Sequence, residues 1–546
     1  MPSSHPGPGT PTGVLAADLR SIISIGVDDW QRDFSWPVGE AEFRRLVEEV
    51  DTIFAGAYEE LDDPWSDLLV ADIRFRYHII QFLHAAAVTA ICQRQSVRIL
   101  AAAGNLSPSR VEWATLGSEY TRRISEEHRN RPYMALRQLR RRFIYNRHLP
   151  AWRRALPTPG GPVWSLGPLH QPKLEYIARH RLRCGFPFLE YEAARSWPQS
   201  SRGTDKPREL LRRWLVRLAS ALDTDVGAAL DAERISNAWI ERLAALGLLY
   251  DAVRRRTGPK WQLLVSGPSN AFIRTTALAA MKSGAKVTGF FHGHHAGYKA
   301  SSDVCYTDLA ICNEFVTATA NAAKSYKEIS ETLEFTRNRG IRFVSMDSEF
   351  YRCLWRSHEG RRTSQATRSV MLVGFPMSEY RYNYGTGLFA PTRLDLELRL
   401  LSDLRAGGFR TLYKPHPATV ATVADVMRGR ADEVLTAPFE DVYRSADILL
   451  FTYVETSTFG FAVCTDSAVV LLDFDESSWN ARIRNQLQGR CAIVPSQFDA
   501  RNRIDFDVAT LLRAVKTAPA KRDYSYVHEF LIPNTAAGPI GTGSRP

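Results

Sequence analysis

The chain has 546 residues, which is too long for one compact core and favours two to four domains at roughly 150 residues each. Its 45% hydrophobic and 24% charged residues are typical of an ordinary soluble globular protein. No apolar run approaches the roughly 20 residues that a membrane-spanning helix needs. Residues 1–13 are rich in Pro, Gly and Ser and lack the pattern of a signal peptide, so we expect a disordered tail and a cytoplasmic protein.

The formal charge of +11 is distributed unevenly along the chain. Eleven arginines lie between Arg122 and Arg154 against Glu126 and Glu127, interleaved with aromatic residues. Such a segment suits an anionic lipid surface, a polyanionic acceptor or nucleic acid. We favour a membrane surface or an acceptor and expect no nucleic-acid partner. A solvated arginine-rich helix face has about equal weight.

The seven cysteines are scattered, with no CxxC pair and no Cys/His spacing typical of a zinc site. We therefore expect reduced, mostly buried thiols.

The first half of the chain is mainly helical in pattern. Apolar residues recur at spacings of three and four over residues 41–90, and a helical pattern returns over residues 208–256. Between them, residues 96–104 predict a short buried strand that ends at a glycine, and residues 162–168 predict a second one. No residue set in 208–256 suggests chemistry.

Strands and helices alternate after Lys260, which is typical of βαβ units on a parallel sheet. The predicted strands are 261–270, 285–295, 308–313 and 341–347, and the predicted helices are 271–284 and 314–335. Residues 357–368 are polar and predict a linker. A second alternation follows, with strands at 369–376, 409–415, 447–453 and 467–475 and helices at 392–408, 440–446 and 459–466.

These patterns predict an α/β protein with two Rossmann-like domains facing across a cleft and with helical N-terminal additions. The predicted divisions are an N-terminal domain with helical insertions at 14–356, the linker at 357–368, a C-terminal domain at 369–520 and a C-terminal tail at 521–546. Ligands of such sheets bind beyond the carboxyl ends of the strands.

Lys414 and His416 follow a predicted strand and lie between prolines that restrict the backbone. A cation and an imidazole held at this edge suit a phosphate. At the end of the next strand, Thr456, Ser457 and Thr458 open a helix, where hydroxyls and backbone N–H groups offer a second phosphate-binding element. Taken alone, His416 is equally well explained as a histidine that stabilises a turn, and Ser457 is equally well explained as a helix N-cap. Together they favour a nucleotide donor.

Three motifs carry a family resemblance over roughly residues 260–500. They are KPHP (414–417), ETSTFGFA (455–462) and FFHGHHAGYK (290–299). The chain resembles two-Rossmann (GT-B) glycosyltransferases of the bacterial capsule, lipopolysaccharide and teichoic-acid group, which includes polysialyltransferases, Kdo transferases and CDP-glycerol glycerophosphotransferases. The resemblance implies a cytidine-type donor (CMP or CDP) bound by the C-terminal domain, and a glycan or lipid-linked acceptor bound by the N-terminal one. The resemblance also implies a cytoplasmic enzyme that is peripherally attached to the inner face of the membrane.

The sequence departs from this group in three respects, one of which is that no Asp/Glu-Asp/Glu-Gly triplet of the polysialyltransferase kind is evident near the cleft edge of the first predicted sheet. Phe461 and Ala462 stand where many GT-B enzymes carry an acid that holds ribose hydroxyls, and Glu455 is the candidate replacement. His294 and His295 follow His292-Gly293 where the glycerophosphotransferases have Thr-Pro. Gly374, at the end of the first strand of the second alternation, completes the predicted donor-binding set.

An inverting transferase needs a base for the acceptor hydroxyl and groups that stabilise the departing phosphate. We expect His292 as the base, because an imidazole titrates near pH ~6.5. His294, His295 and Asp303 are alternates, and a backbone-bonded turn histidine is the structural alternative for His292. No DxD pair stands out, so we expect metal independence and no cofactor.

Two other classes stay open. A two-Rossmann sugar-nucleotide epimerase would need acids in the cleft for carbon–proton chemistry, and few are evident. A non-catalytic nucleotide-sugar-binding protein would keep the phosphate elements without turnover.

Overall fold

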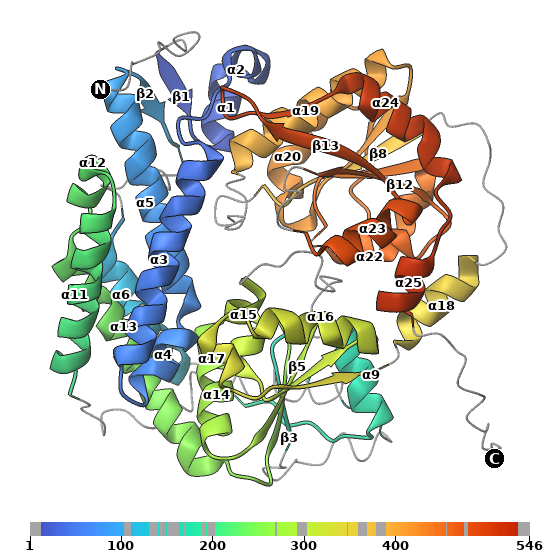
Figure 1. Ribbon diagram of the computed structural model, residues 1–546. Helices are drawn as coiled ribbons and strands as arrows, with labels where there is room; N and C mark the ends of the chain where they lie inside the picture. The colour runs from blue at the N-terminus through green and yellow to red at the C-terminus, as the bar shows by residue number, and fades with distance from the viewer. Residues whose placement is uncertain are drawn as a thin grey trace, which may run out of the picture.

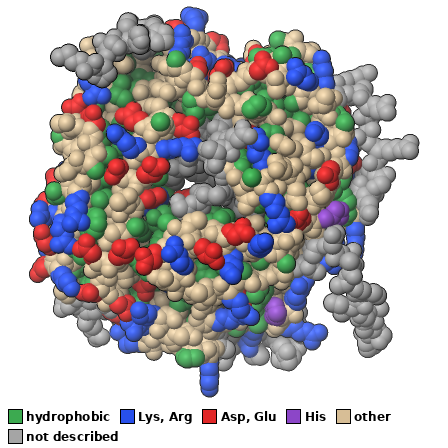
Figure 2. Space-filling model, viewed as in Figure 1, with side chains coloured by type: hydrophobic (Ala, Val, Ile, Leu, Met, Phe, Trp, Pro, Cys, Tyr) green, Lys and Arg blue, Asp and Glu red, His purple; other side chains and the backbone are tan. Residues whose placement is uncertain are grey.

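The structure is a computed structural model in which three units surround a central hollow (Figures 1 and 2). One unit is helical, one is built on a five-stranded sheet and one on a seven-stranded sheet. The described residues are 13–102, 111–129, 140, 146, 149, 163–168, 170–187, 189, 193, 203–267, 270–291, 303–346, 348–358, 369–377, 389–454, 456–473 and 479–532. The predicted tail at 1–13 therefore lies almost wholly outside them, as do residues 359–368 of the predicted linker.

The helical unit confirms the two helical stretches predicted before residue 260. Its helices are α1 (Leu19–Ile25), α2 (Val27–Asp33), α3 (Glu40–Glu60), α4 (Trp65–Ala71), α5 (Ile73–Arg94), α6 (Trp113–Arg129), α11 (Asp205–Ala221), α12 (Thr224–Ala228) and α13 (Ala232–Arg256). In α3 the buried residues Phe43, Leu46, Val50 and Phe54 recur at spacings of three and four, which places them on one face. The strand predicted at 96–104 is β2 (Arg98–Leu100), which pairs in parallel with β1 (Val14–Ala16). The prediction that this strand is buried was wrong, because β2 is partly exposed.

The five-stranded sheet is entirely parallel, and its strands lie in chain order. They are β3 (Val163–Leu166), β4 (Gln262–Val265), β5 (Lys286–Phe290), β6 (Glu314–Thr317) and β7 (Arg342–Ser345). Around them lie α9 (Gln171–Arg179), α14 (Ala271–Lys282), α15 (Asp303–Thr307), the 3-10 helix η2 (Leu309–Ile311), α16 (Ala320–Ser330), α17 (Glu334–Arg337) and α18 (Glu349–His358). Because the strand order never reverses, the described strands contain no switch point. α4 and α13 of the helical unit pack on α14.

One predicted strand of this sheet was misplaced. Residues 308–313 form the buried η2 turn, and the strand β6 begins at Glu314, where we expected a helix. Asn313 sets this start because its side chain accepts from Val287 N (2.8 Å) and donates to Ala285 O (3.1 Å) beside β5. A short apolar run cannot by itself distinguish a buried turn from a strand.

The seven-stranded sheet has the order β10-β9-β8-β11-β12-β13-β14. Its strands are β8 (Ser369–Val373), β9 (Arg410–Lys414), β10 (Glu433–Val434), β11 (Ile448–Phe451), β12 (Ala468–Asp473), β13 (Ala492–Phe498) and β14 (Ile504–Phe506), and only β14 is antiparallel to its neighbour. All four strands predicted for this domain are present. If the six parallel strands are numbered 1 to 6 in the order in which they follow along the chain, from β8 to β13, their order across the sheet is 3-2-1-4-5-6. The winding therefore reverses between the paired strands β8 and β11.

Helices cover both faces of this sheet, since successive residues of β8 and β11 enter different apolar clusters. The helical segments are α19 (Ala390–Ala406), η3 (Pro417–Thr419), α20 (Val420–Met427), α21 (Phe439–Val442), η4 (Tyr443–Ser445), α22 (Ser457–Val463), α23 (Ala481–Arg490), α24 (Val508–Thr517), η6 (Ala518–Ala520) and α25 (Ser525–Phe530). Residues 521–532, assigned to the predicted tail, include α25. This helix packs against α16 of the other sheet, with Thr319 Oγ1 donating to Glu529 O at 2.7 Å.

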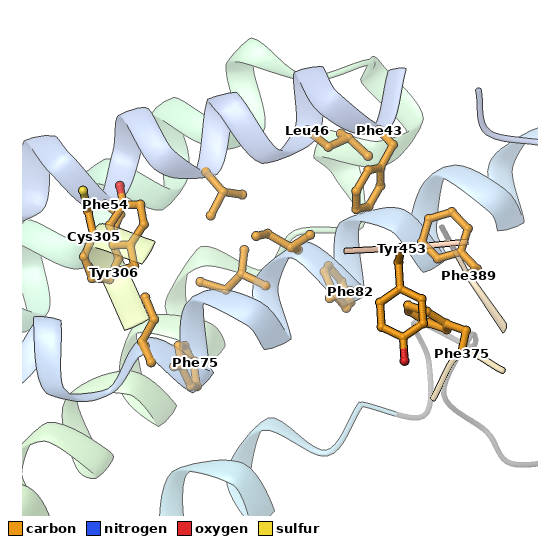
Figure 3. Close-up of a cluster of buried hydrophobic side chains, with 14 of the residues drawn as sticks. Phe43, Leu46, Phe54, Phe75, Phe82, Cys305, Tyr306, Phe375, Phe389 and Tyr453 are labelled. Atoms are coloured by element: carbon orange, nitrogen blue, oxygen red, sulfur yellow. The ribbon is translucent and has the colours of Figure 1, made fainter. Parts of the chain in front are cut away.

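An aromatic cluster joins the helical unit to the seven-stranded sheet (Figure 3). The His84 ring of α5 stacks on Phe389, which precedes α19, with ring centroids 3.9 Å apart and planes at 13°. Trp36 and Phe43 also contact Phe389, and Asn502 Nδ2 donates to Trp36 O at 2.7 Å. Burial of these rings fixes α5 against the start of α19.

Candidate functional site

The winding reverses between β8 and β11, and the carboxyl ends of strands at such a reversal are where ligands of open parallel sheets generally bind. Gly374 and Phe375 follow β8, and Thr452 and Tyr453 follow β11. We expected the KPHP and Ser/Thr motifs at the ends of neighbouring strands. They are not neighbours, because β8 lies between β9 and β11.

Gly374 lies in very close contact with the Tyr413 side chain. A Cβ at this position would be 2.4 Å from Tyr413 Oη and 2.8 Å from its Cζ. The Tyr413 hydroxyl is held in place because it donates to Glu397 Oε2 at 2.7 Å. The Tyr453 hydroxyl donates to Gly374 O at 3.5 Å. A residue without a side chain is therefore required here, which gives the predicted donor-site glycine a structural reason.

Glu397 and Arg393 of α19 hold the backbone just after β8 and just after β11, and neither was predicted from the sequence. Glu397 Oε1 accepts from Phe375 N at 2.7 Å, and Arg393 Nη1 donates to Thr452 O at 2.8 Å. The guanidinium also lies 4.3 Å from the centre of the Phe375 ring. Burial raises the pKa of Glu397 to about 7, although hydrogen bonds from Phe375 N and Tyr413 and the Arg393 charge oppose the rise. The sequence feature that could have indicated them is the presence of charged residues within the leucine-rich helix α19, which is largely buried.

Lys414 is the last residue of β9, and its side chain is buried. Its Nζ donates to Pro415 O at 2.9 Å. Burial lowers the pKa of Lys414, and the charge of Glu440 opposes this. The Lys414 ammonium group therefore lies buried against the backbone of the KPHP turn.

His416 is half-buried and has the role of a turn histidine in this structure. Its Nδ1 accepts from Ala418 N at 3.1 Å and caps η3. A neutral imidazole that accepts at Nδ1 carries its proton on Nε2. In this tautomer, the group His416 can offer to a phosphate is an Nε2–H donor.

The Ser/Thr motif opens α22, and its N-cap is Thr456 where we had named Ser457. Thr456 Oγ1 accepts from Thr458 N at 3.3 Å and lies 2.7 Å from Thr458 Oγ1. Ser457 is exposed. Two of the three hydroxyls thus already interact with each other.

Glu455 lies outside the described residues, so its predicted ribose contact is untested. Phe461 is buried against the rings of Phe439 and Tyr443, and Ala462 is also buried.

Among the predicted bases, only Asp303 lies within the described residues. His292, His294 and His295 fall in the undescribed stretch 292–302 that follows β5. Asp303 begins α15, where its Oδ1 accepts from the Tyr77 hydroxyl at 3.2 Å and lies 3.9 Å from Arg76 Nη1. Tyr77 and Arg76 belong to α5, and their pairing with Asp303 was not predicted.

The arginine-rich segment is described only in part. Arg122 is exposed on α6, and the Arg123 guanidinium lies 5.0 Å from the centre of the Phe272 ring. Apart from Arg129, the last residue of α6, and Arg140, every later arginine of the segment lies outside the described residues.

Among the residues that the structure describes, no group of three or more His, Cys, Asp or Glu side chains could hold a metal ion. No helix in this part of the chain combines the length and the apolar content needed to cross a bilayer. The seven cysteines are free, and all but Cys353 are buried.

Comparison with known proteins identifies no relative: no protein-family model matches the chain, and no curated protein matches it. The family resemblance therefore rests on the three short motifs quoted above.

Proposed function

We propose that this protein is an inverting glycosyltransferase of the GT-B type. It moves a sugar from a nucleotide-activated donor, of the cytidine type, to a bacterial surface-polysaccharide or lipid-linked acceptor. The proposal rests on the strand order of the seven-stranded sheet. Its winding reverses between β8 and β11, which supports a nucleotide-binding crevice at the carboxyl ends of these strands, where Gly374, Phe375 and Thr452 lie.

The KPHP turn supports a phosphate site beside this crevice. It follows β9, the strand next to β8, and offers a half-buried imidazole with a buried ammonium beneath it. A buried charge acts through a lower dielectric than an exposed one, so its field on a nearby phosphate is stronger. Together, Lys414 and His416 supply the positive charge and hydrogen-bond donor that a departing phosphate needs, which is why we propose a metal-independent reaction.

The rigid support of the crevice also favours ligand binding. Arg393 and Glu397 lie one turn apart on α19 and fix the backbone on its two sides. Preorganised groups of this kind lower the cost of ordering a ligand site.

Membrane attachment is the remaining part of the proposal. Capsule and lipopolysaccharide acceptors grow on lipid carriers, and the arginine-rich segment 122–154 would hold the enzyme on the anionic inner face of the membrane.

Nucleotide binding tests the proposal first. A thermal-shift screen against CMP, CDP, UDP and GDP should show stabilisation by at least one nucleotide, because a ligand stabilises the state that binds it. No stabilisation by any of the four would refute the proposed donor site.

Labelled nucleotide sugars then separate the three classes. Transfer of the label to an acceptor supports the glycosyltransferase, and an isomerised donor identifies an epimerase. Binding without either product identifies a nucleotide-sugar-binding protein.

A further inference from the structure

A polar cluster lies between α5 of the helical unit and α15 of the unit built on the five-stranded sheet. Asp303 begins α15, in the connection between the carboxyl end of β5 and the start of β6. Its side chain is 40% exposed. Both the Tyr77 hydroxyl (3.2 Å) and Arg76 Nη1 (3.9 Å) lie against its Oδ1. The carboxylate is thus oriented about one oxygen while remaining accessible.

Arg76 is built into this cluster as a fixed charge. Its side chain is almost fully buried, and its Nε donates to Asp51 Oδ1 at 2.6 Å. The Tyr306 ring lies under the guanidinium, 4.5 Å from ring centre to Cζ. Nη1 makes no hydrogen bond to any described residue. A buried guanidinium with one nitrogen uncommitted to a hydrogen bond is costly to maintain unless the cluster has a further role.

Helix α5 connects this cluster with the nucleotide side of the molecule. Arg76 and Tyr77 lie near its start, and His84 stacks on Phe389 at the beginning of α19. In Figure 3, Phe54 and Tyr306 lie toward one end of the view, and Phe375, Phe389 and Tyr453 lie toward the other. Positions 76 and 84 are separated by about 12 Å along the axis at ~1.5 Å per residue. One rigid helix therefore sets the spacing between the two sheet units.

We propose that Asp303, positioned by Tyr77 and Arg76, is the catalytic base on the acceptor side, so that helix α5 completes the active site. This inference rests on the proposed function. The Asp303 carboxylate takes the proton of the acceptor hydroxyl, and the acceptor oxygen bonds to the anomeric carbon of the donor sugar. The bond from that carbon to the phosphate oxygen breaks, and its electron pair leaves with the nucleotide.

The test uses the full-length protein and the nucleotide sugar whose nucleotide binds it. Release of nucleotide is measured with water as acceptor, because the same base activates water. Calorimetry with the free nucleotide measures donor-site integrity independently. Asp303→Asn should lower kcat at least ~100-fold, the usual contribution of a positioned base, and leave the nucleotide Kd unchanged within about two-fold. Asp303→Glu should recover part of the lost turnover.

Tyr77→Phe tests the positioning role. Removing one hydroxyl that orients the carboxylate should lower kcat about ten-fold and leave the KM for the donor unchanged. Glu328→Gln is the matched control, because Glu328 is an exposed carboxylate on α16 of the same unit, outside the cluster. This variant should behave as wild type in both assays.

Several outcomes overturn the inference. The first is a wild-type kcat in Asp303→Asn, and the second is an equal loss of nucleotide affinity and turnover in that variant. The third is a wild-type protein that binds nucleotide but releases no nucleotide from the donor. A wild type that binds no nucleotide refutes the proposed function itself, and the inference fails with it.

Discussion

Replacing Glu397 with Gln should stabilise the protein at neutral and alkaline pH. Burial raises the pKa of this carboxyl from 4.5 to about 7 in the folded state. Between these values the folded protein binds a proton that the unfolded chain has lost, so the free energy of unfolding falls as pH rises through this window. Above pH ~7 the ionised carboxylate costs about 3 kcal/mol, at ~1.36 kcal/mol for each pKa unit.

The amide of Gln cannot ionise but has a similar shape. Its oxygen can accept from Phe375 N as Glu397 Oε1 does, and its NH2 group can donate to the Tyr413 hydroxyl. Allowing about 1 kcal/mol for the changed hydrogen bond, we expect Glu397→Gln to be about 2 kcal/mol more stable than wild type at pH 8. At pH 5 we expect it to be no more stable than wild type.

Urea denaturation at pH 5, 6, 7 and 8, followed by fluorescence and circular dichroism, measures this difference. Glu433→Gln is the control, since Glu433 is an exposed carboxylate in a surface pair with Arg410 and its loss should change stability by less than ~1 kcal/mol. If Glu397→Gln keeps the pH dependence of wild type, the buried carboxyl does not titrate in the stated window.

Three further predictions concern the donor site and the basic segment. Gly374→Ala should cost about 1–3 kcal/mol in the free energy of unfolding and weaken nucleotide binding, because its Cβ would displace Tyr413. His416→Ala should abolish sugar transfer while the circular dichroism spectrum stays that of wild type, since the Nε2–H donor to phosphate is lost. Replacing Arg140, Arg141 and Arg142 with Glu should reduce co-sedimentation with anionic vesicles, at about 1 kcal/mol for each basic side chain near the surface, and binding should fall as salt rises.

Each of these predictions has a result that contradicts it. Wild-type stability and affinity in Gly374→Ala would mean that Tyr413 moves at no cost. Wild-type turnover in His416→Ala would leave the histidine with its turn role alone. Equal partitioning of the wild-type protein to neutral and anionic vesicles would show that the basic segment is a solvated or internally paired face.

Local sequence was sufficient to predict most elements of the two sheets. Each of β8, β9, β11 and β12 is a run of buried β-favouring residues that ends at glycine, proline or a polar turn, and each was predicted within a few residues. The mixed α/β class followed from their alternation with helices. The prediction at 308–313 failed because a buried turn and a buried strand have the same apolar composition. Three strands of the seven-stranded sheet, β10, β13 and β14, were not predicted.

The order of the strands could not be predicted from local sequence. Whether β11 joins the sheet beside β10 or beside β8 depends on packing of distant helices, since either placement gives the same hydrophobic pattern along the chain. The KPHP and Ser/Thr motifs were consequently expected on neighbouring strands that the fold separates.

The burial of charged groups was likewise decided by tertiary structure. Lys414 and Glu397 have side chains that are usually exposed, and only the surrounding elements show that each is enclosed and hydrogen-bonded. Asp303 and Tyr77 lie 226 positions apart in the chain. Sequence alone determined which segments could form strands, helices and polar turns, because these depend on neighbouring residues. Tertiary structure decided which side chains face each other, because such contacts form only when segments far apart in the chain are buried together.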